Sequence, residues 1–142
     1  MQINEILTRE QQCIAPDATL TQAAKMMKSL GVDMLPVCEN DRLIGTITDH
    51  DIVVRALAAG AKPDNTTVHQ AMTREAVYCF EDEDVMEAAL LMKHRQTRRL
   101  PVINRDQQLV GVVTFDDLTR TGPSRKNGRR SLTEHLQAGL MI

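Results

Sequence analysis

A hydroxyl followed three residues later by a carboxylate occurs twice in this 142-residue sequence, each time after an apolar stretch. The first copy is Thr48-x-x-Asp51 and the second is Thr114-x-x-Asp117. A threonine hydroxyl at a helix start, beside backbone N–H groups that point out of the helix, is suited to an anion. A carboxylate accepts hydrogen bonds from both hydroxyls of a ribose. The motif therefore indicates a site that takes an anion together with a ribose.

The same residues also fit a purely structural interpretation. Thr48 and Thr114 then act as helix N-caps, and the acids lie in the first turn, where the helix dipole stabilises negative charge. A duplication copies caps as readily as binding sites, so the repetition does not choose between the two interpretations.

Catalytic and metal motifs are not found in the sequence. There is no nucleophile elbow, no phosphate-binding glycine loop and no paired-cysteine redox motif. Asp49 with Asp51 forms a poor acid–base pair, because neighbouring positions on a helix point in different directions. The four histidines show no metal-ligand spacing: His50, His69, His94 and His135. We expect a protein that is not an enzyme and needs no metal or cofactor.

The pattern around the motif is itself duplicated. A shift of 65 positions places Asp17 on Asp82 and Leu35-Pro36-Val37 on Leu100-Pro101-Val102. One inserted residue near Gln107 changes the shift to 66, after which the two hydroxyl–carboxylate motifs coincide. Such a register indicates a repeated structural unit. The boundaries that follow are repeat 1 at 3–60, a linker at 61–67, repeat 2 at 68–121, and a basic tail at 122–142 that includes a possible short helix.

Each repeat has the pattern of a β-α-β-β-α unit. In repeat 1 a short apolar strand precedes a helix whose apolar residues follow helical spacing: Leu20, Ala23, Ala24 and Met27. Two apolar strands, Met34–Cys38 and Leu43–Ile47, lead to a second helix at His50–Ala59. A unit of this size buries little surface alone. We therefore predict an α+β fold in which the two repeats pack against one another with pseudo-twofold symmetry.

Composition excludes several classes of function. The chain has 17 Lys and Arg against 19 Asp and Glu, and only one Tyr, two Phe and no Trp. Neither nucleic acid nor an anionic membrane is the expected partner of a chain with this charge. No apolar run reaches the ~20 residues that a membrane helix needs, and the N-terminus lacks a signal-peptide pattern. We expect a cytoplasmic protein, with the basic tail as a solvated linker or, as the weakest alternative, a nucleic-acid contact.

Two of the three cysteines, Cys13 and Cys38, lie on strands that we expect to be neighbours in one sheet. A disulfide or redox switch is one interpretation of this pair. In a reducing cytosol, buried thiols are the other.

The duplicated unit, the Leu-Pro-Val before its second strand and Gly-h-h-Thr-x-x-Asp together resemble cystathionine-β-synthase (CBS) domains over about residues 3–121. Two in tandem resemble a Bateman module, and the stretch 48–60 is similar to small stand-alone prokaryotic CBS pairs. The resemblance implies a regulatory module that binds AMP, ADP, ATP or S-adenosylmethionine in clefts between repeats. In such clefts the threonine contacts phosphate and the aspartate holds the ribose, although many members have no established ligand.

The resemblance also implies two unequal clefts. In family members that bind phosphate, the two residues before Leu-Pro-Val face the nucleotide held by the other repeat. Arg98 and Arg99 would then join Thr48 and Asp51 in the favoured site, because arginine forms charge-assisted bonds to phosphate. Thr114 and Asp117 would share a weaker site with Asp33 and Met34. The alternative for the arginines is a solvated basic face.

The expected partners are a second copy of the chain and an unknown regulated protein. A homodimer is predicted through the apolar face of the second helix, formed by Ile52, Val53, Ala56 and Leu57. The alternative function, from a different class, is a structural or interaction module that dimerises without any ligand.

Overall fold

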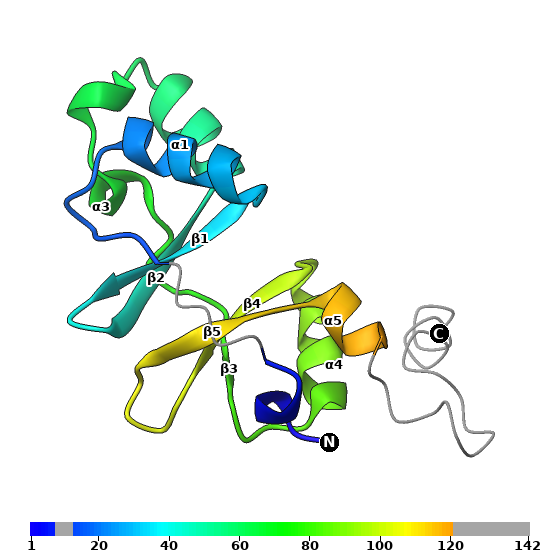
Figure 1. Ribbon diagram of the computed structural model, residues 1–142. Coiled ribbons are helices and arrows are strands. Elements are labelled where there is room, and N and C mark those ends of the chain that lie inside the picture. Colours follow the sequence, from blue (N-terminus) through cyan, green and yellow to red (C-terminus); the bar gives the residue numbers. More distant parts are fainter. Residues whose placement is uncertain (8–12, 121–142) are drawn as a thin grey trace. The chain divides into compact units, whose positions relative to one another are not determined.

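The computed structural model describes residues 1–7 and 13–120 (Figure 1). These residues form two compact units, which we call the first-repeat unit (13–76 with 107–109) and the second-repeat unit (1–7, 77–106 and 110–120). The predicted α+β class is confirmed by the mixture of helices and short sheets in both units. Within these described ranges, no helix has the length and apolar character that crossing a membrane requires. The basic tail, 122–142, lies outside the described residues.

The second repeat follows the predicted β-α-β-β-α order, whereas in the first repeat the expected first strand is reduced to a single parallel bridge between Ile14 and Val37. The first-repeat unit contains α1 (Leu20–Leu30), β1 (Met34–Glu39), β2 (Arg42–Thr48), α2 (Asp49–Asp51), η2 (Ile52–Leu57), η3 (Pro63–Asn65) and α3 (Val68–Ala71). The second-repeat unit contains η1 (Ile3–Glu5), β3 (Cys79–Phe80), α4 (Val85–Arg95), β4 (Arg99–Ile103), α5 (Phe115–Arg120) and all of β5 (Leu109–Thr114) except its first residue.

The helix α1 begins and ends where the sequence predicts. Thr19 Oγ1 accepts the Gln22 backbone N–H at 3.1 Å, and Gln22 Oε1 accepts the Thr19 N–H at 2.9 Å. Gly31 follows the helix with φ of 67°, a left-handed conformation that glycine adopts without strain. The equivalent helix α4 is followed by Gln96, which takes the same left-handed conformation with φ of 55°.

The strands of the two repeats are arranged alike. β1 and β2 form an antiparallel pair in which Met34 lies opposite Thr48, so the hydroxyl–carboxylate motif starts at the end of the pair. Ile14 pairs in parallel with Val37, and Cys79 pairs in parallel with Val102 in the second-repeat unit. Both pairs are related by the 65-residue shift seen in the sequence.

The second helix of repeat 1 differs from its prediction. The chain makes one short helix, α2, and then continues as η2 with wider, π-helical turns, in which the Ala58 N–H donates to the Val53 carbonyl at 2.9 Å. Three consecutive β-branched residues, 52–54, disfavour a regular α-helix because their side chains lose rotamer freedom there. Ile52 and Ala56, which are 8% and 1% exposed, lie in the core of their own unit.

The compact units do not coincide with the sequence repeats. The first short helix of each repeat packs in the unit formed mainly by the other repeat: the Ile3 N–H donates to the Glu83 carbonyl at 2.9 Å, and the Val68 N–H donates to the Ala18 carbonyl at 2.8 Å. Both Ile3 and Val68 are fully buried. Burial of these apolar side chains favours the exchange, because Ile3 and Val68 each become part of the core of the unit that receives them.

Each unit has its own apolar core. The core of the first-repeat unit consists of Ile14, Leu20, Ala23, Met27, Leu35, Val37, Ile47, Ile52, Ala56, Val68, Ala71 and Met72. The core of the second-repeat unit consists of Ile3, Cys79, Val85, Ala88, Ala89, Met92, Leu100, Val102, Val113 and Leu118. In both units the strand that precedes the hydroxyl–carboxylate motif is anchored in the core, by Ile47 or by Val113.

Candidate functional site

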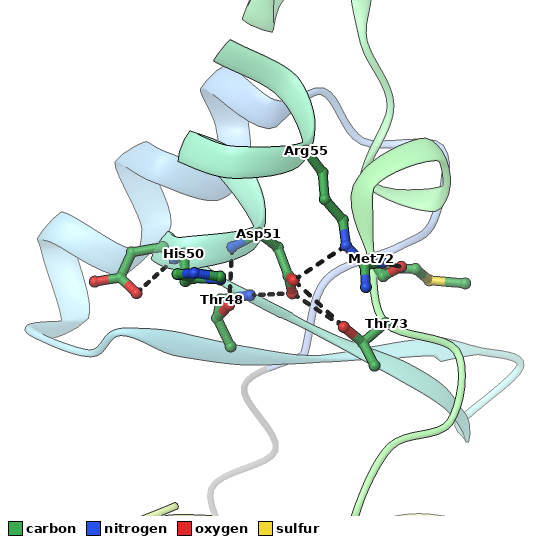
Figure 2. Close-up of polar contacts among 7 residues, drawn as sticks. Thr48, His50, Asp51, Arg55, Met72 and Thr73 are labelled. Carbon is green, nitrogen blue, oxygen red and sulfur yellow. Dashed lines mark hydrogen bonds and ion pairs between the residues drawn. The ribbon is translucent and has the colours of Figure 1, made fainter. Parts of the chain in front are cut away.

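The motif in the first-repeat unit forms a reciprocal cap at the junction of β2 and α2. The Asp51 N–H donates to Thr48 Oγ1 at 3.0 Å, and the Thr48 N–H donates to Asp51 Oδ2 at 3.0 Å (Figure 2). Two helix-start N–H groups are thus satisfied within the motif itself. The structural interpretation of the motif accounts for these two bonds.

The Asp51 carboxylate has further partners that a cap does not require. It is 6% exposed, and Thr73 Oγ1 donates to its two oxygens at 3.3 and 3.4 Å. Arg55 Nε lies 3.7 Å from Asp51 Oδ1, while Arg55 Nη1 donates to the Met72 carbonyl at 3.0 Å. Figure 2 shows these side chains converging on the carboxylate from η2 and from the segment after α3. Because a buried carboxylate is costly without partners, these contacts supply the hydrogen bonds and the opposite charge that it needs there.

The segment after α3 lies directly against β2. Thr46 and Thr73 exchange backbone hydrogen bonds of 3.0 and 2.8 Å. A Cβ atom on Gly45 would lie 2.6 Å from the Thr73 carbonyl oxygen, which is closer than a side chain can approach. The glycine of Gly-h-h-Thr-x-x-Asp is therefore required here by the approach of Thr73 to the strand.

A cavity of ≈ 600 Å³ opens beside this cluster within the first-repeat unit. It is lined by Arg55, His69, Gln70, Met72, Thr73, Arg74 and Glu75. Arg74 Nη2 lies 3.2 Å from His69 Nε2. Two of the lining residues, Arg55 and Thr73, also contact Asp51. The cavity therefore combines two cationic side chains with the partners of a buried carboxylate.

The residues that line the cavity were not predicted as a site. A local signal existed for Arg55, which is four residues after Asp51 and so on the same face of a helical segment. No local signal links Asp51 to Thr73, because 22 residues separate them and only the backbone pairing with β2 brings them together.

The second motif has the same internal bonds. The Asp117 N–H donates to Thr114 Oγ1 at 3.1 Å, and the Thr114 N–H donates to Asp117 Oδ2 at 3.1 Å. Asp117 is partly exposed, whereas Asp51 is buried. The cap is thus conserved between the copies of the duplication while the exposure of the carboxylate differs.

The two arginines before Leu-Pro-Val lie in the second-repeat unit, beside the motif of their own repeat. The Arg98 carbonyl accepts the Phe115 N–H at 2.8 Å. The Arg98 guanidinium pairs with Asp116 at 3.0 Å and lies 4.9 Å from the centre of the Phe115 ring. Arg99 begins β4, and its N–H donates to Thr97 Oγ1 at 3.5 Å. The combination of both arginines with the Thr48 motif of the other unit stays a prediction.

The corresponding position in the first-repeat unit carries an acid. The Asp33 carbonyl accepts the Asp49 N–H at 3.0 Å, as Arg98 does for Phe115. Met34 follows as the first residue of β1. One copy thus has an acidic residue beside the motif where the other copy has an arginine.

The predicted dimer face needs a correction. Ile52 and Ala56 belong to the core of the first-repeat unit, whereas Val53 and Leu57 are exposed at 54% and 49%. Val54, at 48%, joins them. The prediction placed all four residues on one face, but the pair Ile52 and Ala56 faces the core while the pair Val53 and Leu57, one residue further along, faces solvent.

The remaining candidate ligands were the cysteines and histidines. In residues 1–7 and 13–120, no three His, Cys, Asp or Glu side chains gather in a way that could hold a metal ion. Cys13, Cys38 and Cys79 are free thiols. His135 lies outside the described residues.

Comparison with known proteins places both repeats in one family. The sequence model described as "CBS domain" matches residues 3–57 and again 68–123. Hypoxic response protein 1 of Mycobacterium tuberculosis is 36% identical over 121 residues, which cover 84% of this chain and 83% of that protein.

Solved structures support the same assignment. A crystal structure of Hypoxic Response Protein I with two coordinated zinc ions has a TM-score of 0.79 and 35% identity, covering 87% of this chain and 100% of the other. The CBS domain pair of protein MJ0100, in complex with 5′-methylthioadenosine and S-adenosyl-L-methionine, has a TM-score of 0.73 and 29% identity, covering 84% of this chain and 94% of the other.

Proposed function

We propose a function for this chain from the premise that it belongs to the CBS-domain family, of which it contains two tandem copies. The chain is a non-catalytic regulatory module that binds an adenosyl ligand and communicates its presence to a partner protein. The related CBS pair of MJ0100 binds two adenosyl compounds, which supports this ligand class. AMP, ADP, ATP and S-adenosylmethionine are the candidates.

The observation that carries the proposal is the environment of Asp51. Its carboxylate is buried, yet the Thr73 hydroxyl contacts it only at 3.3 and 3.4 Å, longer than an ordinary O–H···O bond of about 2.7–2.8 Å. The two hydroxyls of a ribose bind the carboxylate in place of Thr73 and make shorter bonds. Thr48 Oγ1, which accepts the Asp51 N–H, keeps its own proton to donate to a phosphate oxygen.

Charge determines which form of the ligand the site prefers. Arg55 and Arg74 line the cavity beside Asp51, and Glu75 is the acid among the lining residues. The favoured site further includes Arg98 and Arg99, as the family pattern implies, and these neutralise phosphate groups. Thr114 and Asp117 form the weaker site, because Asp33 adds negative charge there. We therefore propose one anionic adenine nucleotide per chain.

A ligand-free module that dimerises is the second candidate. The observation in its favour is the exposed apolar group Val53, Val54 and Leu57 on η2, each about half exposed. A second copy of the chain covers this group, as apolar interfaces of homodimers do. Dimerisation is compatible with either candidate, so ligand binding decides between them.

Calorimetric titration with AMP, ATP and S-adenosylmethionine, paired with thermal unfolding, tests the proposal. A ligand that binds only the folded protein raises the melting temperature, by an amount equivalent to about 2.7 kcal/mol at a hundred times its Kd. Isosteric Asp51→Asn removes the charge that accepts the ribose hydroxyls and abolishes the shift, while Asp117→Asn retains it.

The outcomes of this experiment are distinct. Heat and a thermal shift for wild type but not for Asp51→Asn support the nucleotide site. Failure of all three compounds, with a dimer by light scattering that Leu57→Asp converts to monomer, establishes the ligand-free module instead.

A further inference from the structure

Cys13 and Cys38 lie side by side in the first-repeat unit. The Ile14 N–H donates to the Pro36 carbonyl at 2.9 Å, and the Cys38 N–H donates to the Ile14 carbonyl at 3.0 Å. Because this pairing is parallel, Cys13 and Cys38 lie on the same face of the two segments, diagonally across from one another on either side of the Ile14–Val37 pair. The Cys13 side chain is hydrogen-bonded to the Cys38 thiol. The backbone pairing thus puts both side chains on one face of neighbouring segments, and their hydrogen bond brings the two thiols into contact.

The two thiols differ in access. Cys38 is 7% exposed, whereas Cys13 is partly exposed. Burial is the main cause that raises the pKa of the Cys38 thiol to about 12, and the neighbouring Cys13 is the second cause. A reagent from solvent therefore meets Cys13 first, because the thiolate is the attacking species and access favours the more exposed sulfur.

Cys79 provides an internal reference. It is fully buried, its Sγ lies 3.9 Å from the Pro101 carbonyl oxygen, and burial raises its pKa to about 12. The 65-residue shift relates Cys13 to Tyr78 and Cys38 to Ile103, so repeat 2 does not carry a cysteine at either position. The neighbouring pair is specific to repeat 1.

We propose that Cys13 and Cys38 are a dithiol modification site that forms an intramolecular disulfide by exchange with a small disulfide such as oxidised glutathione. The Cys13 thiolate attacks one glutathione sulfur and releases one glutathione thiol, leaving a mixed disulfide on Cys13. The Cys38 sulfur then loses its proton, attacks Cys13 and releases the second glutathione thiol. Two protein thiols are oxidised, one glutathione disulfide is reduced, and both protons end on glutathione.

The disulfide closes the chain from residue 13 to residue 38, a loop that contains α1. Closing a loop of this kind restricts the unfolded chain and so stabilises the folded one. We expect the melting temperature of the oxidised protein to exceed that of the reduced protein by several degrees. This consequence is independent of the proposed nucleotide site.

The test is to equilibrate the full chain with oxidised and reduced glutathione at several ratios, block free thiols, unfold the protein and count them. The expected result is one free thiol, from Cys79, with an intact mass lower by two hydrogen atoms. Cys79→Ser should leave none. Cys13→Ser should lose both the mass change and the rise in melting temperature.

Three results overturn the proposal. They are three free thiols at the most oxidising ratio, glutathione adducts that never resolve to an internal bond, and disulfide-linked dimers in place of the internal bond. Since the wild-type thiol count decides the question, a folding defect in a variant does not affect it.

Discussion

The two units form the same cap from Thr48 with Asp51 and from Thr114 with Asp117, yet they surround it differently. The paired bonds are 3.0 Å each in one copy and 3.1 Å each in the other. Around Asp51 the carboxylate is buried and is met by Arg55 and Thr73, whereas Asp117 is partly exposed. The comparison shows that the two cap hydrogen bonds are what a helix start requires. The burial of the carboxylate and its contacts with Arg55 and Thr73 are found in the first copy, where the cap alone does not require them.

A second contrast lies near the β-turns that follow β1 and β4. In the second-repeat unit Arg105 pairs with Asp82 at 2.8 Å and lies 3.9 Å from the centre of the Phe80 ring. The residues related to these three by the 65-residue shift are Asn40, Asp17 and Ala15. Repeat 1 instead has the two neighbouring cysteines. The duplicated framework therefore carries two different side-chain contacts between the same pair of backbone segments.

The largest expected effect is on ligand affinity. Asp51→Ala and Arg99→Ala should each weaken binding of an anionic adenine nucleotide at least about tenfold, since a bond to a charged group contributes about 1.5–3 kcal/mol. Asp117→Ala should have little effect. Isothermal calorimetry on folded variants, checked by circular dichroism, measures the difference. Equal losses from the two aspartate variants, or two equivalent sites per chain, would contradict the asymmetry.

A substitution at Gly45 should separate Thr73 from the motif. Gly45→Ala introduces a Cβ that meets the Thr73 carbonyl oxygen at 2.6 Å, so the backbone must shift, and we expect a loss of about 1–3 kcal/mol in unfolding free energy. Urea denaturation measures it. Gly31→Ala is the control. It measures the cost of a side chain at a left-handed backbone conformation (φ of 67°) without a steric contact, because a Cβ on Gly31 meets nothing within 4 Å. No loss from Gly45→Ala would show that the approach of Thr73 is not required.

The caps themselves should contribute equally. Thr48→Ala and Thr114→Ala each remove one side-chain acceptor at a helix start, and we expect each to lower the unfolding free energy by about 1 kcal/mol. Chemical denaturation of both variants checks the equality. A loss several times larger for Thr48→Ala alone would mean that the first cap also supports the cluster around Asp51.

The smallest effect is expected at the Arg105–Asp82 pair. The hydrogen bond from Arg105 lowers the pKa of the exposed Asp82 carboxyl below its ordinary value. A carboxyl with a lower pKa in the folded state stabilises the fold above its unfolded pKa and loses this contribution as the pH falls through the folded pKa. Arg105→Ala should therefore narrow the difference in stability between neutral and acidic pH, and salt should reduce the effect. An unchanged pH dependence would show that the pair contributes nothing.

Local patterns identified most of the fold. The capping box of Thr19 and Gln22, the glycine after α1 and the alternation of β-strands with turns are all short-range signals, and α1, β1 and β2 appear where these signals place them. The duplicated Thr-x-x-Asp is equally local, so its cap was predictable from spacing.

Long-range relationships were not predictable from these patterns. The packing of Thr73 against Asp51 depends on a strand-like pairing between distant segments, for which the sequence has no local marker. The burial of Ile52 and Ala56 depends on which side of η2 packs on the core of the first-repeat unit, and the run of apolar residues at 52–57 does not decide that. The similarity of the two repeats likewise did not predict that Ile3 would pack in the core of the second-repeat unit.

The exchanged short helices set an order for folding during synthesis. Except for residues 107–109, the first-repeat unit is one continuous stretch, so its core can assemble soon after residue 76 has left the ribosome. The second-repeat unit needs Ile3, which is made first, and Leu118, which is made more than a hundred residues later. The nascent chain must therefore carry Ile3 without its native burial site until the second repeat emerges. A chaperone or the ribosome surface can meet that apolar segment during the interval.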